Sequence, residues 1–359
     1  MVTAEAVIDI KALMHNYNTL KSLCKGQRVI AVVKGDAYGH GAVRVAQVLH
    51  SSDMFAVSRI EEAIELRQER VKNPILLLEG CFCADDLVLA SKYNLDTTIH
   101  CKEQLDELES TPFSRAIHVW IKLDTGMHRL GFQPHELSSV TARIEASKKA
   151  ILPVGFMSHF SSAYDKCSKR TEHQINCFLE ATAPYLGPKT LANSAGVLYW
   201  DQSCFDYCRL GIALYGISPA KGETGAKLGL KPVMTLRTRL IAVRRHRAYQ
   251  PIGYGGEWIP CQDTNIGVVA MGYGDGFPRG APSGTPVYIN GRRVPIVGCV
   301  SMDMITVDLG LKEQDKIGDI AEFWGSGLPV EVVSETAGTI PYELVVKLAK
   351  RVKRTYLGY

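Results

Sequence analysis

Short apolar runs alternate with stretches of helical periodicity through the first 210 residues. A short strand at 7–10 and an amphipathic helix, with Leu13, Tyr17, Leu20 and Leu23 on one face, come first. Eight strand-like runs follow, at 29–33, 54–57, 75–78, 97–99, 119–123, 154–157, 190–192 and 207–210. Stretches of helical spacing separate them, for example 60–70, 102–109, 136–148 and 172–185. This alternation predicts a parallel sheet, and eight units over about 200 residues predict a (β/α)₈ barrel, with a doubly wound sheet as the alternative.

The pattern changes in the last third of the chain, where β-branched runs and glycines are frequent and helical stretches are few. Runs at 285–289 and 294–297 flank Asn290-Gly291 and predict a hairpin, because that dipeptide supplies the positive φ angles of a type I′ turn. A last helix is expected from Pro341. We attribute the basic residues of 347–354 to its C-terminal end, where cations complement the helix dipole.

We therefore expect two domains. The first is a (β/α)₈ TIM-type barrel over 11–230, and the second is a mainly antiparallel β domain over 231–359 with the N-terminal strand 1–10 packed on it. Of the 359 residues, 46% are hydrophobic and 22% are charged, which is typical of a folded chain long enough to bury two cores.

Charge and cysteine usage exclude several other classes. The formal net charge is only +4 and is spread along the chain, which does not indicate nucleic-acid binding. The N-terminal segment lacks a secretory pattern and no apolar run is long enough to span a membrane, so we expect a cytoplasmic protein. The 10 cysteines form no CxxC pair, and we expect reduced thiols and no metal site.

Lys34 stands at the end of the first predicted barrel strand, directly before the glycine-punctuated segment 35–41. In parallel barrels the carboxyl ends of the strands carry the active site. A single lysine at such a place is most often just exposed to solvent. The residues that follow the other strands therefore decide whether Lys34 is interpreted as an active-site residue.

Polar groups follow several of the other predicted strands. They are Lys122 and Arg129 after the fifth, His159 after the sixth, Ser194 after the seventh, and Arg209, Gly211 and Ile212 at the eighth. Taken singly, Ser194 could cap a helix and Arg129 could pair with Asp124. Together, Ser194 and the amides of Gly211 and Ile212 suit a phosphate at the usual barrel position.

A desolvated lysine beside an anion site and an arginine can form an imine with a cofactor aldehyde, which indicates pyridoxal phosphate. Signatures of competing chemistries do not occur. Gly272 to Gly276 is not a GxGxxG motif after a strand, Gly222 to Lys227 is not a P-loop, and the sequence has no HExxH or GxSxG.

Six segments, spread over both predicted domains, resemble the bacterial alanine racemases. They are 33–41, 122–131, 209–216, 253–255, 272–276 and 301–303. The resemblance implies a pyridoxal-phosphate-dependent isomerase that interconverts L- and D-alanine with two bases, either to supply D-alanine for peptidoglycan or to catabolise it. It also implies a head-to-tail homodimer with active sites at the subunit interface. Gly35, where alanine is common, and Ser301, at a variable position, are the departures that we note.

The resemblance also implies a role for each site residue. Lys34 would carry the cofactor and act as the base that faces the α-proton of D-alanine, and Tyr254 would be the opposing base, contributed to the barrel of the other subunit. The cofactor phosphate would contact Tyr38, Ser194, Gly211, Ile212 and Tyr342. Arg209 would face the pyridine nitrogen, His159 would lie between Arg209 and the cross-subunit tyrosine, and Arg129 would bind near the phenolic oxygen and the substrate carboxylate. Lys122, similar to a lysine often carbamylated in the family, would steady Arg129, while Tyr273, Met302 and Asp303 would be contributed across the interface.

Two other functions remain open at this point. A pyridoxal-phosphate-dependent decarboxylase can share the architecture, but it usually has a glycine-rich phosphate loop and a cysteine contributed across its dimer. A cofactor-carrying barrel protein of the homeostasis type lacks a β domain. Substrate breadth is also open, although Tyr342 and Tyr254 are expected to crowd the substrate side chain and so to favour alanine.

Overall fold

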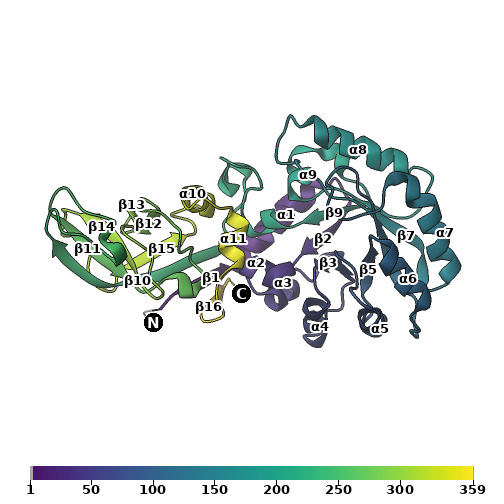
Figure 1. Ribbon diagram of the computed structural model, residues 1–359, viewed down its shortest axis with the longest axis horizontal. Coiled ribbons are helices and arrows are strands. Elements are labelled where there is room, and N and C mark those ends of the chain that lie inside the picture. The colour runs from purple at the N-terminus through teal and green to yellow at the C-terminus, as the bar shows by residue number, and fades with distance from the viewer. Residues whose placement is uncertain (1–2, 359) are drawn as a thin grey trace. The chain divides into compact units, whose positions relative to one another are not determined.

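The computed structural model describes residues 3–358, and Figure 1 shows its course. Contacts along the chain divide it into two compact units. We call the part that spans 17–37 and 41–214 the barrel unit. We call the part formed by the N-terminal residues up to 16, residues 38–40 and the chain from 215 onward the β unit.

The strands of the barrel unit form a closed barrel in which all neighbours are parallel. They are β2 (Arg28–Val32), β3 (Met54–Val57), β4 (Ile75–Leu77), β5 (Asp96–Ile99), β6 (Ile117–Lys122), β7 (Ala150–Met157), β8 (Lys189–Thr190) and β9 (Tyr207–Leu210). Closure comes from β2, which pairs with both β3 and β9. This confirms the predicted (β/α)₈ barrel and excludes the doubly wound sheet.

Helices surround the barrel strands (Figure 1). They are α1 (Ile10–Leu23), α3 (Ala42–Val48), α4 (Ile60–Gln68), α5 (Ala84–Tyr93), α6 (Lys102–Ser110), α7 (Leu137–Ser147), α8 (Lys169–Thr182) and α9 (Ser194–Tyr199). Because the helices cover the outside and side chains fill the inside, most strand residues are buried, although β7 has exposed residues near its start. All residues of β3, β4, β5 and β9 are buried, which in β3 and β4 explains the continuous apolar runs.

The sheet of the β unit is mainly antiparallel, as predicted, and runs in the order β13-β12-β15-β10-β1-β16, with β11 paired to β10 and β14 paired to β11. Its strands are β1 (Glu5–Asp9), β10 (Met234–His246), β11 (Thr264–Val269), β12 (Pro286–Ile289), β13 (Arg292–Pro295), β14 (Ile305–Gly310), β15 (Ile320–Trp324) and β16 (Lys353–Leu357). The helices α10 (Val330–Thr336) and α11 (Pro341–Val346) complete the unit. Only the pairing of β1 with β16 is parallel among these described strands.

The predicted hairpin is present as β12 and β13, joined through Asn290 and Gly291, whose φ values are +45° and +82°. The prediction for 347–354 was wrong. Helix α11 ends at Val346, before the basic stretch. Arg351 instead pairs with Asp275 and Asp303 at 2.7 Å each, and Arg354 donates to the carbonyl of Gly39 at 3.0 Å.

Within residues 3–358, no helix has both the length and the apolar character that a membrane crossing requires. The same residues contain no cluster of three or more His, Cys, Asp or Glu side chains arranged to hold a metal ion.

Candidate active site at the carboxyl ends of the barrel strands

Lys34 follows β2 and opens the short helix α2 (Lys34–Gly39). Its side chain is half-buried. Burial lowers the pKa of the Lys34 amine, and the positive charges of Arg129 and Arg209 lower it further, against the opposing carboxylates of Glu79 and Glu62. Because only a deprotonated amine is a nucleophile, this environment favours imine formation.

Helix α2 is a left-handed turn, whereas the sequence predicted only a loop. From Gly35 to Gly39 every φ is positive, with values between +52° and +79°. The left-handed conformation costs a non-glycine residue about 1–2 kcal/mol, so the stretch Asp36-Ala37-Tyr38 needs support from its surroundings. The carbonyl of Asp36 accepts from Gly41 N–H at 2.9 Å and its Oδ1 accepts from Ala42 N–H at 2.8 Å.

Glu62 of α4 fixes the beginning of this turn. Its Oε1 accepts a hydrogen bond from Gly35 N–H at 2.6 Å, and its Oε2 accepts from the N–H groups of Ser58 and Arg59 at 3.0 Å each. One carboxylate therefore holds both the residue after Lys34 and the start of α4. Glu62 is not among the residues predicted from the sequence, although a glutamate three residues after a helix N-cap is typical of a capping box.

Arg209, near the end of β9, is held rigidly by four hydrogen bonds. Nη1 donates to Thr190 Oγ1 at 2.9 Å, and Nη2 donates to the carbonyl oxygens of Ser158 at 2.6 Å and Leu191 at 3.1 Å and to His159 Nδ1 at 3.4 Å. All four bonds use Nη1 or Nη2. Among the described residues, the Nε–H of Arg209 donates to no acceptor and remains available. Burial lowers the pKa of Arg209 to about 10, so the guanidinium stays protonated at neutral pH.

His159 is neutral in this setting. Burial lowers its pKa well below the usual value, and the charges of Arg209, Lys122, Arg129 and Lys34 act in the same direction. Since a guanidinium can only donate, the contact with Arg209 assigns Nδ1 as the acceptor. The imidazole proton therefore sits on Nε2, where it can be donated to another group.

Lys122 and Arg129 add two more cations to the same side of the barrel. Lys122 is the last residue of β6, and burial together with Arg209, Arg129 and Lys34 lowers its pKa to about 8. Arg129 is exposed in the loop after β6. Asp124 does not pair with Arg129, because its carboxylate accepts from the ring of His128 at 3.1 Å and from two backbone N–H groups of the loop.

Ser194, Gly211 and Ile212 lie together at the ends of β8 and β9. The Oγ of Ser194 accepts from Gly211 N–H at 2.9 Å and from Ala213 N–H at 3.4 Å. Asn193, not Ser194, provides the side-chain cap of α9, since its Oδ1 accepts from Gly196 N–H at 2.9 Å. The Ser194 hydroxyl and the adjoining amides thus form one hydrogen-bonding cluster.

The remaining site residues belong to the β unit. The buried ring of Tyr38 lies 5.1 Å from Tyr215 and 6.1 Å from Tyr342. Burial raises the pKa of both predicted phosphate contacts, to about 12 for Tyr342, so their hydroxyls remain protonated donors.

Tyr273, Met302 and Asp303 come together in two neighbouring loops of the β unit. Tyr273 N–H donates to the carbonyl of Ser301 at 3.0 Å, and Asp303 pairs with Arg351 at 2.7 Å. Tyr254 stands in a separate glycine-rich turn and its side chain is 72% exposed. Tyr273 and Met302 are exposed as well, at 38% and 53%.

The residues present in the barrel unit fit pyridoxal phosphate. The half-buried amine of Lys34 suits an aldehyde, and the Nε–H of Arg209 is a fixed donor that suits a ring nitrogen. The Ser194 cluster offers a hydroxyl and backbone amides of the kind that bind phosphate. The surplus of cations, from Lys34, Lys122, Arg129 and Arg209, suits a dianionic cofactor and a substrate carboxylate.

Comparisons with known proteins agree over the whole chain. The alanine racemase N-terminal domain family matches residues 8–219, and the alanine racemase C-terminal domain family matches residues 233–356. The alanine racemase of Shewanella baltica (strain OS185) is 53% identical over 97% of each chain, and that of Edwardsiella ictaluri (strain 93-146) is 49% identical over 100% of this chain and 99% of its own.

Two solved structures extend the comparison. The biosynthetic alanine racemase from Pseudomonas aeruginosa superimposes with a TM-score of 0.97 at 41% identity over 100% of both chains. The alanine racemase from Bartonella henselae with covalently bound pyridoxal phosphate gives a TM-score of 0.88 at 31% identity, over 99% of this chain and 100% of its own.

Proposed function

This chain belongs to the alanine racemase family, and we propose that it interconverts L- and D-alanine with pyridoxal phosphate held in the barrel unit. The observation that carries the proposal is the set of Lys34, Arg209 and the Ser194 cluster on one rim, with a lysine whose pKa is lowered by burial. The full-length similarity to named alanine racemases supports the choice of substrate.

In this proposal, different residues bind the aldehyde, the pyridine nitrogen and the phosphate of the cofactor. Lys34 would bind the aldehyde carbon, and Arg209 Nε–H would donate to the pyridine nitrogen. The residues that would hold the phosphate are Ser194, Gly211, Ile212, Tyr38 and Tyr342. When bound to the substrate amine, pyridoxal phosphate withdraws electrons from the α-carbon and so acidifies its hydrogen.

Arg209 donates to the ring nitrogen but does not surrender its proton, because its guanidinium stays charged at working pH. A pyridine nitrogen held by this donor would therefore stay unprotonated. This restrains electron withdrawal and favours return of a proton to the α-carbon over side reactions.

Racemisation needs a proton donor and acceptor on each face of the α-carbon. We assign Lys34 to the face from which the hydrogen of D-alanine leaves, and the partner's Tyr254 to the opposite face. His159 Nε2–H is oriented by Arg209 to stabilise negative charge on that phenolic oxygen. Arg129, steadied by Lys122, binds the substrate carboxylate.

We further propose a head-to-tail homodimer in which the β unit of one protomer completes the site of the other. The exposure of Tyr254, Tyr273 and Met302 supports this, because exposed aromatic and apolar side chains are typical of interfaces. Asp303, next to Met302 in the chain, is held by its ion pair with Arg351.

The cellular role that we propose is cytoplasmic supply of D-alanine for peptidoglycan, with catabolism as the alternative. Growth of a D-alanine auxotroph separates the two. Rescue without added D-alanine supports supply, and rescue only of growth on D-alanine as carbon source supports catabolism.

Incubation with L-alanine in heavy water tests the proposed reaction. We expect loss of optical rotation with incorporation of solvent deuterium at the α-carbon, and alanine should lead a panel of L-amino acids in initial rate. Release of carbon dioxide without racemisation would instead establish the decarboxylase alternative. Lys34→Ala should abolish the visible absorbance of the bound cofactor.

A further inference from the structure

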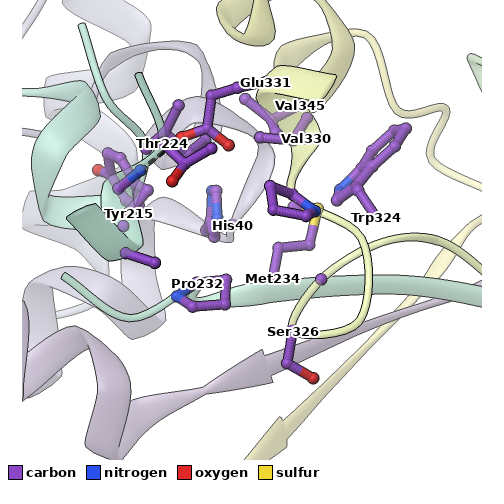
Figure 2. A pocket seen from close by; sticks show the side chains of 16 residues that line it. His40, Tyr215, Thr224, Pro232, Met234, Trp324, Ser326, Val330, Glu331 and Val345 are labelled. Atoms are coloured by element: carbon purple, nitrogen blue, oxygen red, sulfur yellow. Dashed lines mark hydrogen bonds between the residues drawn. The ribbon is translucent and has the colours of Figure 1, made fainter. Parts of the chain in front are cut away.

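The β unit contains a cavity of about 130 Å³, shown in Figure 2. Its walls come from the end of β15, the start of α10, the segment 215–217 and His40, which follows α2. The lining side chains are mostly apolar and include Pro232, Met234, Val330 and Val345. None of the barrel residues that we assign to cofactor or substrate lines it.

Trp324 places an unpaired donor in the wall of this cavity. The residue is only 1% exposed, and its Nε1–H donates to no acceptor within residues 3–358. Figure 2 shows the indole nitrogen at the end of the ring nearest the cavity. Buried N–H groups are paired in the great majority of folded proteins, so this one points to a bound acceptor.

The cavity selects against charge and against a lone water molecule. Glu331 contributes a carboxylate to the wall, and its Oε1 already accepts from the N–H groups of Ser218 at 2.9 Å and Gly225 at 2.8 Å. A second anion would be repelled there, and an isolated cation would lose its hydration in an apolar space. A single water molecule takes up only about 30 Å³, so it would leave most of the cavity of about 130 Å³ unfilled.

We propose that this cavity is a binding site for a small neutral organic molecule with an apolar body and one hydrogen-bond acceptor, such as an ether, ketone or alcohol. The acceptor oxygen receives the Trp324 Nε1–H, and the body packs against Met234, Val330 and Val345. A cavity of about 150 Å³ holds benzene, so a five- or six-membered ring is the largest body expected here.

The site adjoins a group of aromatic residues within the β unit. The ring of His40 stacks on Tyr215 with centroids 4.4 Å apart, and Tyr215 lies 5.1 Å from Tyr38. An occupant therefore contacts the cluster that holds Tyr38. The inference itself concerns binding and does not depend on the proposed racemase activity.

The test compares tetrahydrofuran with cyclopentane, which match in ring size and differ by one acceptor oxygen. Each is titrated into the full-length protein labelled with ¹⁵N in its 4 tryptophans and with ¹³C in the methionine methyl groups. Met234 reports occupancy by either probe, and the Trp324 indole proton reports the hydrogen bond. We expect both probes to shift Met234, only tetrahydrofuran to move the Trp324 proton downfield, and tetrahydrofuran to bind about fivefold more tightly.

Two variants complete the test. Trp324→Phe keeps an aromatic ring without the donor, and it identifies the Trp324 signal by its loss; it should bind the two probes equally. Val330→Leu fills part of the cavity and should weaken both probes in the protein with Trp324 intact. The inference is overturned if neither probe shifts Met234, or if tetrahydrofuran keeps its preference in Trp324→Phe while the variant retains the wild-type thermal midpoint.

Discussion

The cations around Lys34 form a cluster in which each side chain changes the ionisation of the others. Lys122 is the most buried of the lysines, and three positive neighbours add to the effect of burial, so its pKa falls to about 8. Glu79 is the carboxylate that opposes this at Lys122, and it also opposes the lowering at Lys34. The cluster therefore carries a positive potential that remains to be neutralised by anionic groups, as the proposed cofactor and substrate would do.

The pKa of Lys122 predicts how stability depends on pH. In the unfolded chain a lysine titrates near 10.4, so between about pH 8 and 10.4 the unfolded state binds more protons than the folded state. The free energy of unfolding that Lys122 contributes must then rise with pH through this window. Relative to Lys122→Met, the wild-type protein should gain about 1–3 kcal/mol between pH 7.5 and pH 10.

Urea unfolding of both proteins at several pH values, in buffer depleted of carbon dioxide, measures this difference. The comparison with Lys122→Met removes the contribution of titrating groups outside the cation cluster around Lys34. If the difference in free energy of unfolding between the two proteins stayed constant from pH 7.5 to pH 10, folding would not lower the pKa of Lys122.

At the scale of single elements, the left-handed helix α2 explains why Lys34 has a defined position. Gly39 ends this turn at φ +79°, and a Cβ there would stand 2.0 Å from the carbonyl oxygen of Val345. Gly26 has a similar φ of +87°, but a Cβ there would meet nothing within 4 Å. Comparing alanine substitutions at Gly39 and Gly26 therefore separates the cost of backbone strain from the cost of steric overlap.

Gly39→Ala should lower the free energy of unfolding by about 3 kcal/mol or more, because the chain must move to remove the overlap. Gly26→Ala should lower the free energy of unfolding by only about 1 kcal/mol, because alanine is disfavoured by about that much in the left-handed conformation. Chemical denaturation of both variants supplies the measurement. Equal losses would mean that the close approach to Val345 is not constraining.

Glu62 is a positioning residue for Lys34, because its carboxylate binds the amide of the next residue. In Glu62→Gln one of the two acceptor oxygens becomes an NH₂ group that faces N–H donors. We expect kcat for alanine to fall by about 10-fold with KM changed less, and the acidic limb of the pH profile to shift, because the negative charge near Lys34 is lost.

The matched control is Glu61→Gln, one residue earlier on the exposed face of α4. Steady-state rates over pH 6 to 10 distinguish the two variants. If Glu62→Gln lost stability but kept the wild-type pH profile, Glu62 would be a structural residue only.

These elements also show what the sequence could and could not predict. The barrel followed from its alternating runs, since fully buried parallel strands leave a continuous apolar signal. The left-handed turn did not, because Ala37 and Tyr38 have no intrinsic preference for positive φ, and the hydrogen bonds that hold Asp36 go to Gly41 and Ala42, beyond the turn. Glu62 was missed because its contact with Gly35 joins two helices, α2 and α4, that are separated in sequence. The basic stretch after α11 was misassigned because the helix ends before it.

At the scale of the whole molecule, the candidate residues fall in both units. Lys34, Arg209, His159 and Ser194 belong to the barrel unit, whereas Tyr254, Tyr273 and Met302 are exposed on the β unit. The base that we propose for the face opposite Lys34 is thus carried by a different compact unit. We propose that the partner subunit supplies this second base.

Mixing two inactive variants tests that claim most directly. Lys34→Ala and Tyr254→Phe homodimers are unfolded together, refolded and assayed for racemisation of L-alanine, with each variant refolded alone as a control. Random pairing gives heterodimers as half of the molecules, each with one intact and one doubly defective site, so activity should return to about a quarter of the wild-type value. Failure of the mixture to exceed the two variants alone, while native mass spectrometry shows that heterodimers have formed, would contradict a site shared between subunits.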